Sequence, residues 1–200
     1  MSANFDVDTD VTIQNIVGSG TLPVEIKTET LGEALQEFSD DNNYTWMDDG
    51  PQPGLYYEID GDDGPQVTFH ESGSYIVRAD SEEELHETNE LVIGQLKELG
   101  VIDEELDMEE LEFEVQNVVA LAMLNEDIQL RALSLGLGKD AQYEPEVFPA
   151  LEYSTPQYPC SFLVYGNGKI IIAGAGSVEE VREAMSSFFE EMEEAYFSVN

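Results

Sequence analysis

Two short stretches decide the fold: IQNIV at residues 13–17 and VQNVV at residues 115–119. Each stretch alternates apolar and polar residues with a period of two, which predicts a strand with one buried and one open face. A stretch that returns later in the chain, followed by the same order of signals, indicates an internal duplication. The sequence therefore predicts two copies of one structural unit.

A short helix is expected after each of these strands. In the first copy, apolar residues within residues 31–38 lie on one side, and the spacing of Thr30 and Glu33 predicts a capping box that opens the helix. In the second copy, the leucines within residues 130–137 occupy the equivalent place.

A long helix is expected to close each copy. Ser81 with Glu84, and Ser177 with Glu180, both have the spacing of a capping box and follow a β-rich segment. The first long helix is expected to end at Gly100, because glycine is common just past a helix terminus.

A constant spacing supports the duplication. Three pairs of positions are separated by 96 residues: Gln52 and Phe148, Phe69 and Tyr165, and Ser81 and Ser177. We expect a flexible N-terminus at residues 1–10, a first repeat at 11–100, an acidic linker or short helix at 101–112, and a second repeat at 113–200.

The charge of the chain is unusual. Acidic residues outnumber basic residues by 44 to 7, for a formal net charge of −37, and they are spread over every segment. Such self-repulsion destabilises a compact chain at low salt, whereas in molar salt the Debye length falls to about 3 Å. We therefore expect a protein of a salt-rich cytoplasm. The charge alone leaves open a mimic of nucleic acid that attracts basic partners.

Several classes of function find no support in the sequence. The single Cys160 cannot form a disulfide framework, and the only histidines, His70 and His86, have no metal-ligand spacing. No signal peptide or apolar run of membrane-spanning length is recognisable, so we expect a cytoplasmic protein without a membrane partner. GAGS at residues 174–177 suits a tight turn better than an anion site, and no catalytic motif is present. Neither an enzyme nor a cofactor is expected.

The strings YEPEVFPALEY at residues 143–153, VQNVV, and NGKIIIAGAG at residues 167–176 resemble the archaeal and eukaryotic TATA-box-binding proteins. The resemblance spans about residues 11–195 and is stronger in the second repeat. It implies an α+β fold of two repeats, a saddle whose curved antiparallel sheet carries four helices on the convex side. It also implies binding to double-stranded promoter DNA through the minor groove, by the family's known mechanism of apolar wedges inserted at base steps.

The resemblance assigns the residues that contact DNA. Asn15 and Asn117 match the central asparagines of the family, and Val17 and Val119 match its groove-contacting valines. Small hydrogen-bonding groups suit the minor groove, where mainly A·T can be told from G·C. From the strands alone, these asparagines could equally end a strand and the valines belong to a core. The other residues assigned to DNA are Phe69, Ile76, Arg78, Phe148, Tyr165, Lys169, Ile171 and Ala173.

The family carries two phenylalanine wedges in each repeat. Phe148 and Tyr165 match this pair in the second repeat. In the first repeat Phe69 matches one wedge, but Gln52 stands at the position of the other, so a kink at this end of the DNA is in question. Without the resemblance, these aromatic residues would be assigned to a core.

Basic residues depart from the family pattern. Lys169 matches a basic position at the rim of the groove, but its counterpart is Ser74, and a family arginine is replaced by Glu58 and Ser154. Arg78 replaces a threonine, and both DNA contact and pairing with a nearby acid are open to it. Affinity would then come chiefly from buried apolar area, which persists at high salt.

The segment Tyr-Glu-Pro-Glu-x-Phe-Pro at residues 143–149 resembles the family's docking site for transcription factor B. Tyr143, Glu144 and Glu146 would be its contacts, with the two carboxylates meeting basic side chains of the partner. RNA polymerase would be recruited indirectly.

The sequence therefore gives two hypotheses. The first is a general transcription initiation factor that binds the minor groove of A·T-rich promoter DNA, bends it and recruits transcription factor B. The second is a degenerate paralogue that keeps the protein-partner surface but not autonomous DNA binding, and acts as a regulator or decoy. Gln52, Glu58 and Ser74 favour the second, and Glu58 discriminates best because a carboxylate close to phosphate is repelled.

Overall fold

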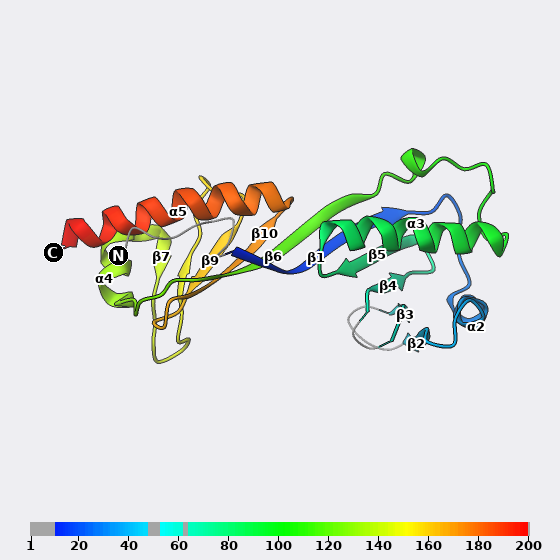
Figure 1. The fold of residues 1–200 in the computed structure, drawn as a ribbon, viewed down its shortest axis with the longest axis horizontal. Coiled ribbons are helices and arrows are strands. Elements are labelled where there is room, and N and C mark those ends of the chain that lie inside the picture. The colour runs from blue at the N-terminus through cyan, green and yellow to red at the C-terminus, as the bar shows by residue number, and fades with distance from the viewer. Residues whose placement is uncertain (1–10, 48–52, 62–63, 200) are drawn as a thin grey trace. The chain divides into compact units, whose positions relative to one another are not determined.

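The structure is a computed structural model, and it describes residues 11–47, 53–61 and 64–199. These residues form two compact units, one of residues 15–116 and one of residues 117–199 together with 11–14. In each unit a long helix lies along an antiparallel sheet (Figure 1). The predicted flexible N-terminus, residues 1–10, and Gln52 lie outside the described residues.

The first unit contains strands in the spatial order β2 (Asn43–Met47), β3 (Gly54–Glu58), β4 (Gln66–Phe69), β5 (Ser74–Ala79) and β1 (Val11–Thr21), the last from residue 15 onward. Its helices are α2 (Thr28–Gln36), which packs on β2 and β3, and α3 (Glu82–Glu98), which packs on β5. A 3₁₀ turn, η1 (Met108–Leu111), follows α3.

The second unit repeats this plan with strands in the order β6 (Glu114–Met123), β10 (Lys169–Ala175), β9 (Ser161–Val164), β8 (Leu151–Tyr153) and β7 (Ala141–Gln142). Its helices are α4 (Leu130–Leu137) and α5 (Val178–Val199), and a short 3₁₀ turn, η2 (Gly138–Asp140), follows α4. Helix α5 packs on both α4 and β10.

The core of the first unit lies between the sheet and α3. Alternate residues of β4 and β5 are fully buried: Val67, Phe69, Tyr75 and Val77. The Tyr75 hydroxyl donates a 2.8 Å hydrogen bond to Asn89 of α3, so the polar end of this buried ring is satisfied. The helix contributes the apolar stripe Leu85, Val92 and Leu96.

The core of the second unit contains an aromatic cluster beneath α5. The rings of Phe162 and Phe188 stack with centroids 4.0 Å apart. Tyr153 and Tyr158 lie beside them and donate hydrogen bonds of 2.8 and 2.9 Å to the two carboxylate oxygens of Glu191. Burial, together with the Glu191 carboxylate, raises the pKa of both tyrosines above the ordinary value of 10.0.

The ends of the long helices follow the sequence signals. Ser81 Oγ accepts from the Glu84 amide at 3.2 Å, and Ser177 Oγ accepts from the Glu180 amide at 3.1 Å. Gly100, at φ 69°, directly follows Leu99, the C-cap residue of α3, and a left-handed conformation at this position favours glycine. The two predicted caps and the predicted helix end are confirmed.

The cap predicted at Thr30 is wrong. Helix α2 begins at Thr28, and its N-cap residue, Lys27, makes no side-chain cap. Thr30 already lies within the first turn, so its hydroxyl donates back to the Lys27 carbonyl at 3.3 Å.

The acidic segment at residues 101–112 is partly structured. It contains η1, and Ile102 and Leu111 are buried. The ammonium group of Lys97 in α3 donates to the Leu106 carbonyl at 2.6 Å. The segment is therefore fixed to the first unit by both apolar and polar contacts.

Candidate nucleic-acid interface

The residues assigned to DNA lie mostly on the face of each sheet that is opposite the helices, here called the open face. Strands alternate along their length, so buried residues and open-face residues follow one another. In β1, Ile16 is fully buried, whereas Asn15 and Val17 on either side are half-exposed. The same alternation places Asn117 and Val119 on the open face of β6.

The open face of the second unit is apolar at its centre. Strand register places Val119 opposite Ala173, and Leu121 opposite Ile171. On the far side of β10, Leu163 also pairs with Ile171. The predicted residues Val119, Ile171 and Ala173 therefore lie together, and Asn117 continues the same face along β6.

An aromatic pair borders this apolar centre. Phe148 and Tyr165 meet edge to face with ring centroids 6.4 Å apart, a favourable arrangement of two aromatic rings. Phe148 is 36% exposed although it is a large apolar side chain. Lys169 extends its ammonium group over the Tyr165 ring, 5.6 Å from the centroid, a cation–π contact that orients the cation. The structure thus brings Phe148, Tyr165 and Lys169 together.

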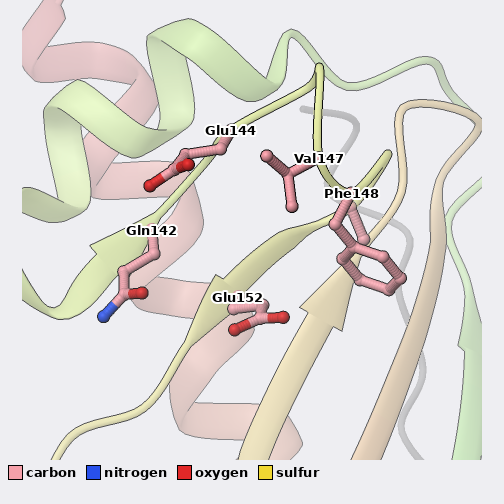
Figure 2. Close-up of a pocket in the computed structure, with 6 residues that line it drawn as sticks. Gln142, Glu144, Val147, Phe148 and Glu152 are labelled. Carbon is pink, nitrogen blue, oxygen red and sulfur yellow. The ribbon is translucent and has the colours of Figure 1, made fainter.

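A shallow pocket of about 180 Å³ lies beside Phe148 (Figure 2). Figure 2 shows Gln142 and Glu152 on neighbouring strands, with Val147 and Phe148 above them. Glu152 pairs with Leu163 and therefore belongs to the open face, so a carboxylate borders its apolar centre. The sequence did not point to this acid.

The residues assigned to transcription factor B lie at this pocket, and one of them, Glu144, lines it (Figure 2). Tyr143 is half-exposed, and Glu144 and Glu146 are exposed, in the segment between β7 and β8. The Glu144 carbonyl accepts from the amides of Val147 and Phe148, each at 2.9 Å. This turn presents the carboxylates to solvent and sets the start of the chain segment that carries Phe148.

Phe69, the wedge predicted for the first repeat, is in the core. It has no exposed surface, its strand partner is the buried Tyr75, and the two ring centroids are 6.2 Å apart. A side chain in this position cannot enter a DNA groove. The prediction for Phe69 is therefore wrong.

The half-exposed His70 occupies the place predicted for Phe69. Its amide donates to the Ser74 carbonyl at 2.9 Å, as the Tyr165 amide donates to the Lys169 carbonyl at 2.8 Å. Gly73 then closes the turn at φ 88°, as Gly168 does at φ 87°. His70 thus corresponds to Tyr165, and its ring Nδ1 lies 2.8 Å from the Pro53 carbonyl.

Two compensating shifts explain the error. The connection from β3 to β4 is one residue longer than the connection from β8 to β9, because Tyr57 pairs with Val67 whereas Tyr153 pairs with Phe162. Strand β10 regains one residue at a bulge, since the register shifts between Ala173 and Ala175. The offset of 96 residues therefore holds up to β3 and again after the bulge in β10, but not from β4 through Arg78 of β5.

The open face of the first unit is polar where the second is apolar. Register places Arg78 opposite both Val17 and Gln66. The Arg78 guanidinium donates to Gln66 Oε1 at 3.0 Å, and Gln66 Nε2 donates to Glu58 Oε1 at 3.4 Å. Arg78 is thus linked to the carboxylate of Glu58 through Gln66, and its contact with DNA stays a prediction. Ile76 lies on the same face, opposite Ser19 and Thr68.

The two central asparagines have different surroundings. Asn117 Oδ1 accepts a 2.9 Å hydrogen bond from the amide of Gly174, the residue at the bulge in β10. Asn15 Oδ1 is buried and has no hydrogen-bond partner among residues 11–47, 53–61 and 64–199. The two asparagines match in sequence but differ in the hydrogen bonds of their side-chain oxygens.

Besides Leu121 and Glu152, the sequence analysis missed three open-face residues on or next to β4 and β9: Thr68, His70 and Leu163. The period-two alternation of β4 and β9, anchored on the glycine turns at Gly73 and Gly168, contains the signal that identifies them.

Comparison with known proteins places these observations in a family. Residues 112–195 match the family model described as "Transcription factor TFIID (or TATA-binding protein, TBP)". TATA-box-binding protein C of Halobacterium salinarum is 40% identical over 186 residues, which is 92% of this chain and 98% of the relative. The chain belongs to the TATA-box-binding protein family.

Other members extend this family relationship beyond the salt-loving archaea. The TATA-box-binding protein of Methanothermobacter thermautotrophicus is 32% identical over 175 residues, covering 88% of this chain and 90% of the relative. The solved structure of Methanococcus jannaschii TBP superposes with a TM-score of 0.70 at 25% identity, over 92% of this chain and 98% of that chain. The expected α+β fold of two repeats is therefore confirmed.

The members of this family are transcription factors, which are not enzymes. Across residues 11–47, 53–61 and 64–199, no helix combines the length and apolar character needed to cross a membrane. Within the same part of the chain, no group of three or more histidine, cysteine or acidic side chains could hold a metal ion.

Proposed function

We propose that this family member is a general transcription initiation factor that binds the minor groove of A·T-rich promoter DNA, bends it and recruits transcription factor B. The observation that supports this most strongly is the open face of the second unit. Strands β6, β9 and β10 are fully described and present Val119, Leu121, Leu163, Ile171 and Ala173 there without an acidic side chain, and the carboxylate of Glu152 on β8 lies at the border of this apolar centre. In a chain of net charge −37, such a surface suits a partner that is itself an anion.

The apolar character of this face suits binding at high salt. Contacts between cationic side chains and phosphate weaken steeply as salt rises, because their free energy comes from released counterions. Burial of apolar surface has the opposite tendency and is strengthened by salts that are excluded from protein surfaces. Lys169 supplies the cation at the edge of this face, and its contact with Tyr165 holds it there.

The bend would be produced at the second repeat by Phe148 and Tyr165. Opening a base step costs a few kcal/mol, which is offset by the larger contact that bent DNA makes with the protein. The exposure of Phe148 supports this role, because an apolar ring gains by leaving water for a base step. The edge-to-face contact with Tyr165 would keep the pair rigid on insertion.

Recruitment of transcription factor B would use Tyr143, Glu144 and Glu146. The two exposed carboxylates suit a basic patch on that partner, and the turn centred on the Glu144 carbonyl fixes the backbone beneath them. RNA polymerase would then be recruited through transcription factor B. We place this function in a salt-rich cytoplasm.

A second candidate function is a paralogue that binds transcription factor B without binding DNA on its own. The observation that favours it is the polar open face of the first unit, where Glu58, Gln66 and Arg78 form a hydrogen-bonded row and His70 stands in place of an apolar wedge. A carboxylate near phosphate repels it unless a cation intervenes.

Fluorescence anisotropy separates the two functions. A labelled A·T-rich promoter duplex is titrated with the protein in molar KCl, with and without transcription factor B. An initiation factor binds saturably, binds a G·C-rich duplex more weakly, and loses affinity on Phe148→Ala. A paralogue that lacks autonomous DNA binding leaves every duplex unbound when alone, while a pull-down still captures transcription factor B.

A further inference from the structure

Asn117 has a fixed orientation because of the bulge in β10. Gly174 lies at the bulge with φ 104°, a conformation that favours glycine. Its amide points to Asn117 Oδ1 and donates at 2.9 Å. An amide that is already donating to the oxygen sets the carboxamide so that Nδ2, a donor, is the group left for a ligand.

The first repeat has no corresponding bulge. Ala79 pairs with Ile16 and Arg78 pairs with Val17 in uninterrupted register, so no residue is inserted between them. The next amide along the chain, that of Asp80, donates to Glu84 Oε2 at 2.8 Å. The equivalent amide in the second repeat, that of Gly176, makes the same bond to Glu180. In the register of β1 with β5, therefore, no inserted residue supplies an amide that corresponds to the amide of Gly174.

The oxygen of Asn15 is buried and accepts no hydrogen bond from the part of the chain that the structure describes. A buried acceptor without a partner is unfavourable. Rotation of the carboxamide by half a turn breaks no hydrogen bond of this oxygen and brings it toward the open face. Asn15 can thus present either a donor or an acceptor, whereas Asn117 presents only a donor.

This difference bears on base recognition. Both A·T orientations present only acceptors in the minor groove, whereas G·C adds the exocyclic amino group of guanine, which is a donor. The donor fixed at Asn117 can donate to the acceptors of an A·T pair, but it faces a second donor, the amino group, at guanine. An amide oxygen at Asn15 accepts from the guanine amino group.

We infer that the two repeats read the minor groove unequally: Asn117 selects A·T, and Asn15, freed by the missing bulge in β5, tolerates a G·C pair. The inference rests on the proposed minor-groove binding and makes Asn15 a specificity-determining residue. The preferred site is then asymmetric, with its one permitted G·C pair beneath the first repeat. That pair also fixes the direction in which the protein lies on the promoter.

The test uses competition anisotropy in molar KCl with three duplexes. The first carries A·T pairs at both central contact positions, the second has G·C at one of them, and the third has G·C at both. The single replacement is expected to weaken binding by less than about threefold, because the protein can turn to place the G·C pair beneath Asn15. The double replacement is expected to weaken it by about tenfold or more, the usual cost of a mismatched pair. Replacing guanine by inosine, which lacks the amino group, restores binding in the third duplex.

A matched pair of variants tests the cause. Insertion of a glycine between Arg78 and Ala79 restores a bulge, and the single G·C replacement then costs about tenfold. Deletion of Gly174 removes the anchor of Asn117, and the double replacement then costs less than about threefold. Urea unfolding and circular dichroism verify that both variants are folded. The comparison of the three duplexes is made with the wild-type protein, so it does not depend on the folding of a variant.

The outcomes are separable. Failure to bind the all-A·T duplex overturns the proposed function and this inference with it. Binding of that duplex with a full tenfold penalty for the single replacement overturns the inference alone. Wild-type asymmetry that persists unchanged in a folded insertion variant overturns the role of the bulge.

Discussion

His70 and Tyr165 occupy the same position in the two repeats: each donates its backbone amide across a glycine turn, His70 to the Ser74 carbonyl at 2.9 Å and Tyr165 to the Lys169 carbonyl at 2.8 Å. In the second repeat this position holds an aromatic ring that contacts Phe148. In the first it holds an imidazole that hydrogen-bonds to the Pro53 carbonyl. The same position therefore holds an aromatic ring packed on another ring in the second repeat, and a polar imidazole in the first repeat.

Substitution of this histidine is expected to strengthen bending. His70→Phe supplies an apolar ring where the second repeat has Tyr165, and a ring inserted at a base step kinks the duplex. We expect a larger bend, measured by energy transfer between dyes at the two ends of a promoter duplex. His86→Phe is the matched control, because it makes the same change on α3, where His86 contacts Phe113. An unchanged bend in His70→Phe, with the duplex bound, would contradict the assignment of His70 to the wedge position.

The same position shows how far the sequence could be interpreted. Repeated motifs and capping serines predicted two copies of one unit of strands and helices, because these signals are local and chemically distinctive, and the family resemblance implied the α+β saddle. They could not reveal that the β3–β4 connection gains a residue and that β10 regains one at Gly174, since the two shifts cancel by Ser81 and Ser177. An aromatic residue at position 69, next to the true site, completed the false match.

The hydrogen-bond partners of the open-face side chains could not be predicted from the sequence either. Identical asparagines in matching strands predict identical roles, and only the register around Gly174 distinguishes Asn117 from Asn15. Likewise, Arg78 and Glu58 are distant in sequence and meet through Gln66 only because three strands lie side by side. Residue types were thus predictable, whereas their partners depended on the packing of strands.

The correction of Phe69 makes a prediction about stability. Phe69→Ala removes a fully buried ring and is expected to lower the free energy of unfolding by about 3–5 kcal/mol. Phe148→Ala removes a ring that is 36% exposed and is expected to cost about 1 kcal/mol or less, while DNA affinity falls about tenfold or more. Urea unfolding in molar KCl measures the first effect, and anisotropy the second. Equal losses of stability in the two variants would place Phe69 outside the core.

The carboxylate of Glu58 is expected to oppose DNA binding. Glu58→Gln keeps an oxygen that can accept from Gln66 but removes a negative charge from the open face. We expect DNA affinity to rise about two- to fivefold, the size of one screened charge interaction in high dielectric. The gain should shrink between 0.5 and 2 M KCl as screening increases. Glu87→Gln on the exposed side of α3 controls for net charge, and a gain of equal size there would refute a local effect.

Charge reversal at Glu144 is expected to separate the two binding surfaces. Glu144→Lys places a cation where the proposed partner is basic, and repulsion should weaken capture of transcription factor B about tenfold. Binding of the A·T-rich duplex without that factor should stay within about twofold. Glu90→Lys, on an exposed position of α3, is the control of equal charge. Undiminished capture by Glu144→Lys would remove this carboxylate from the docking site.

High pH is expected to destabilise the second unit, because a thiol and two tyrosine hydroxyls in its core lose their protons. Burial raises the pKa of the Cys160 thiol from 9.0 to about 11, and burial beside the Glu191 carboxylate raises the pKa of Tyr153 and Tyr158 above 10.0. A pKa raised in the folded state means that the unfolded chain loses its protons first. The stabilisation is therefore complete below about pH 9 and declines as pH rises through the folded values.

Tyr158→Phe tests the origin of this decline. At pH 7 it removes one hydrogen bond to a charged acceptor and is expected to lower the free energy of unfolding by about 1–2 kcal/mol. Above pH 10 it also removes one titrating group, so the variant should lose less stability between pH 9 and 11 than the wild type. Urea midpoints in 2 M KCl across this range provide the measurement. Parallel pH profiles for the two proteins would mean that Tyr158 does not contribute to the alkaline transition, which would then originate at Cys160 or Tyr153.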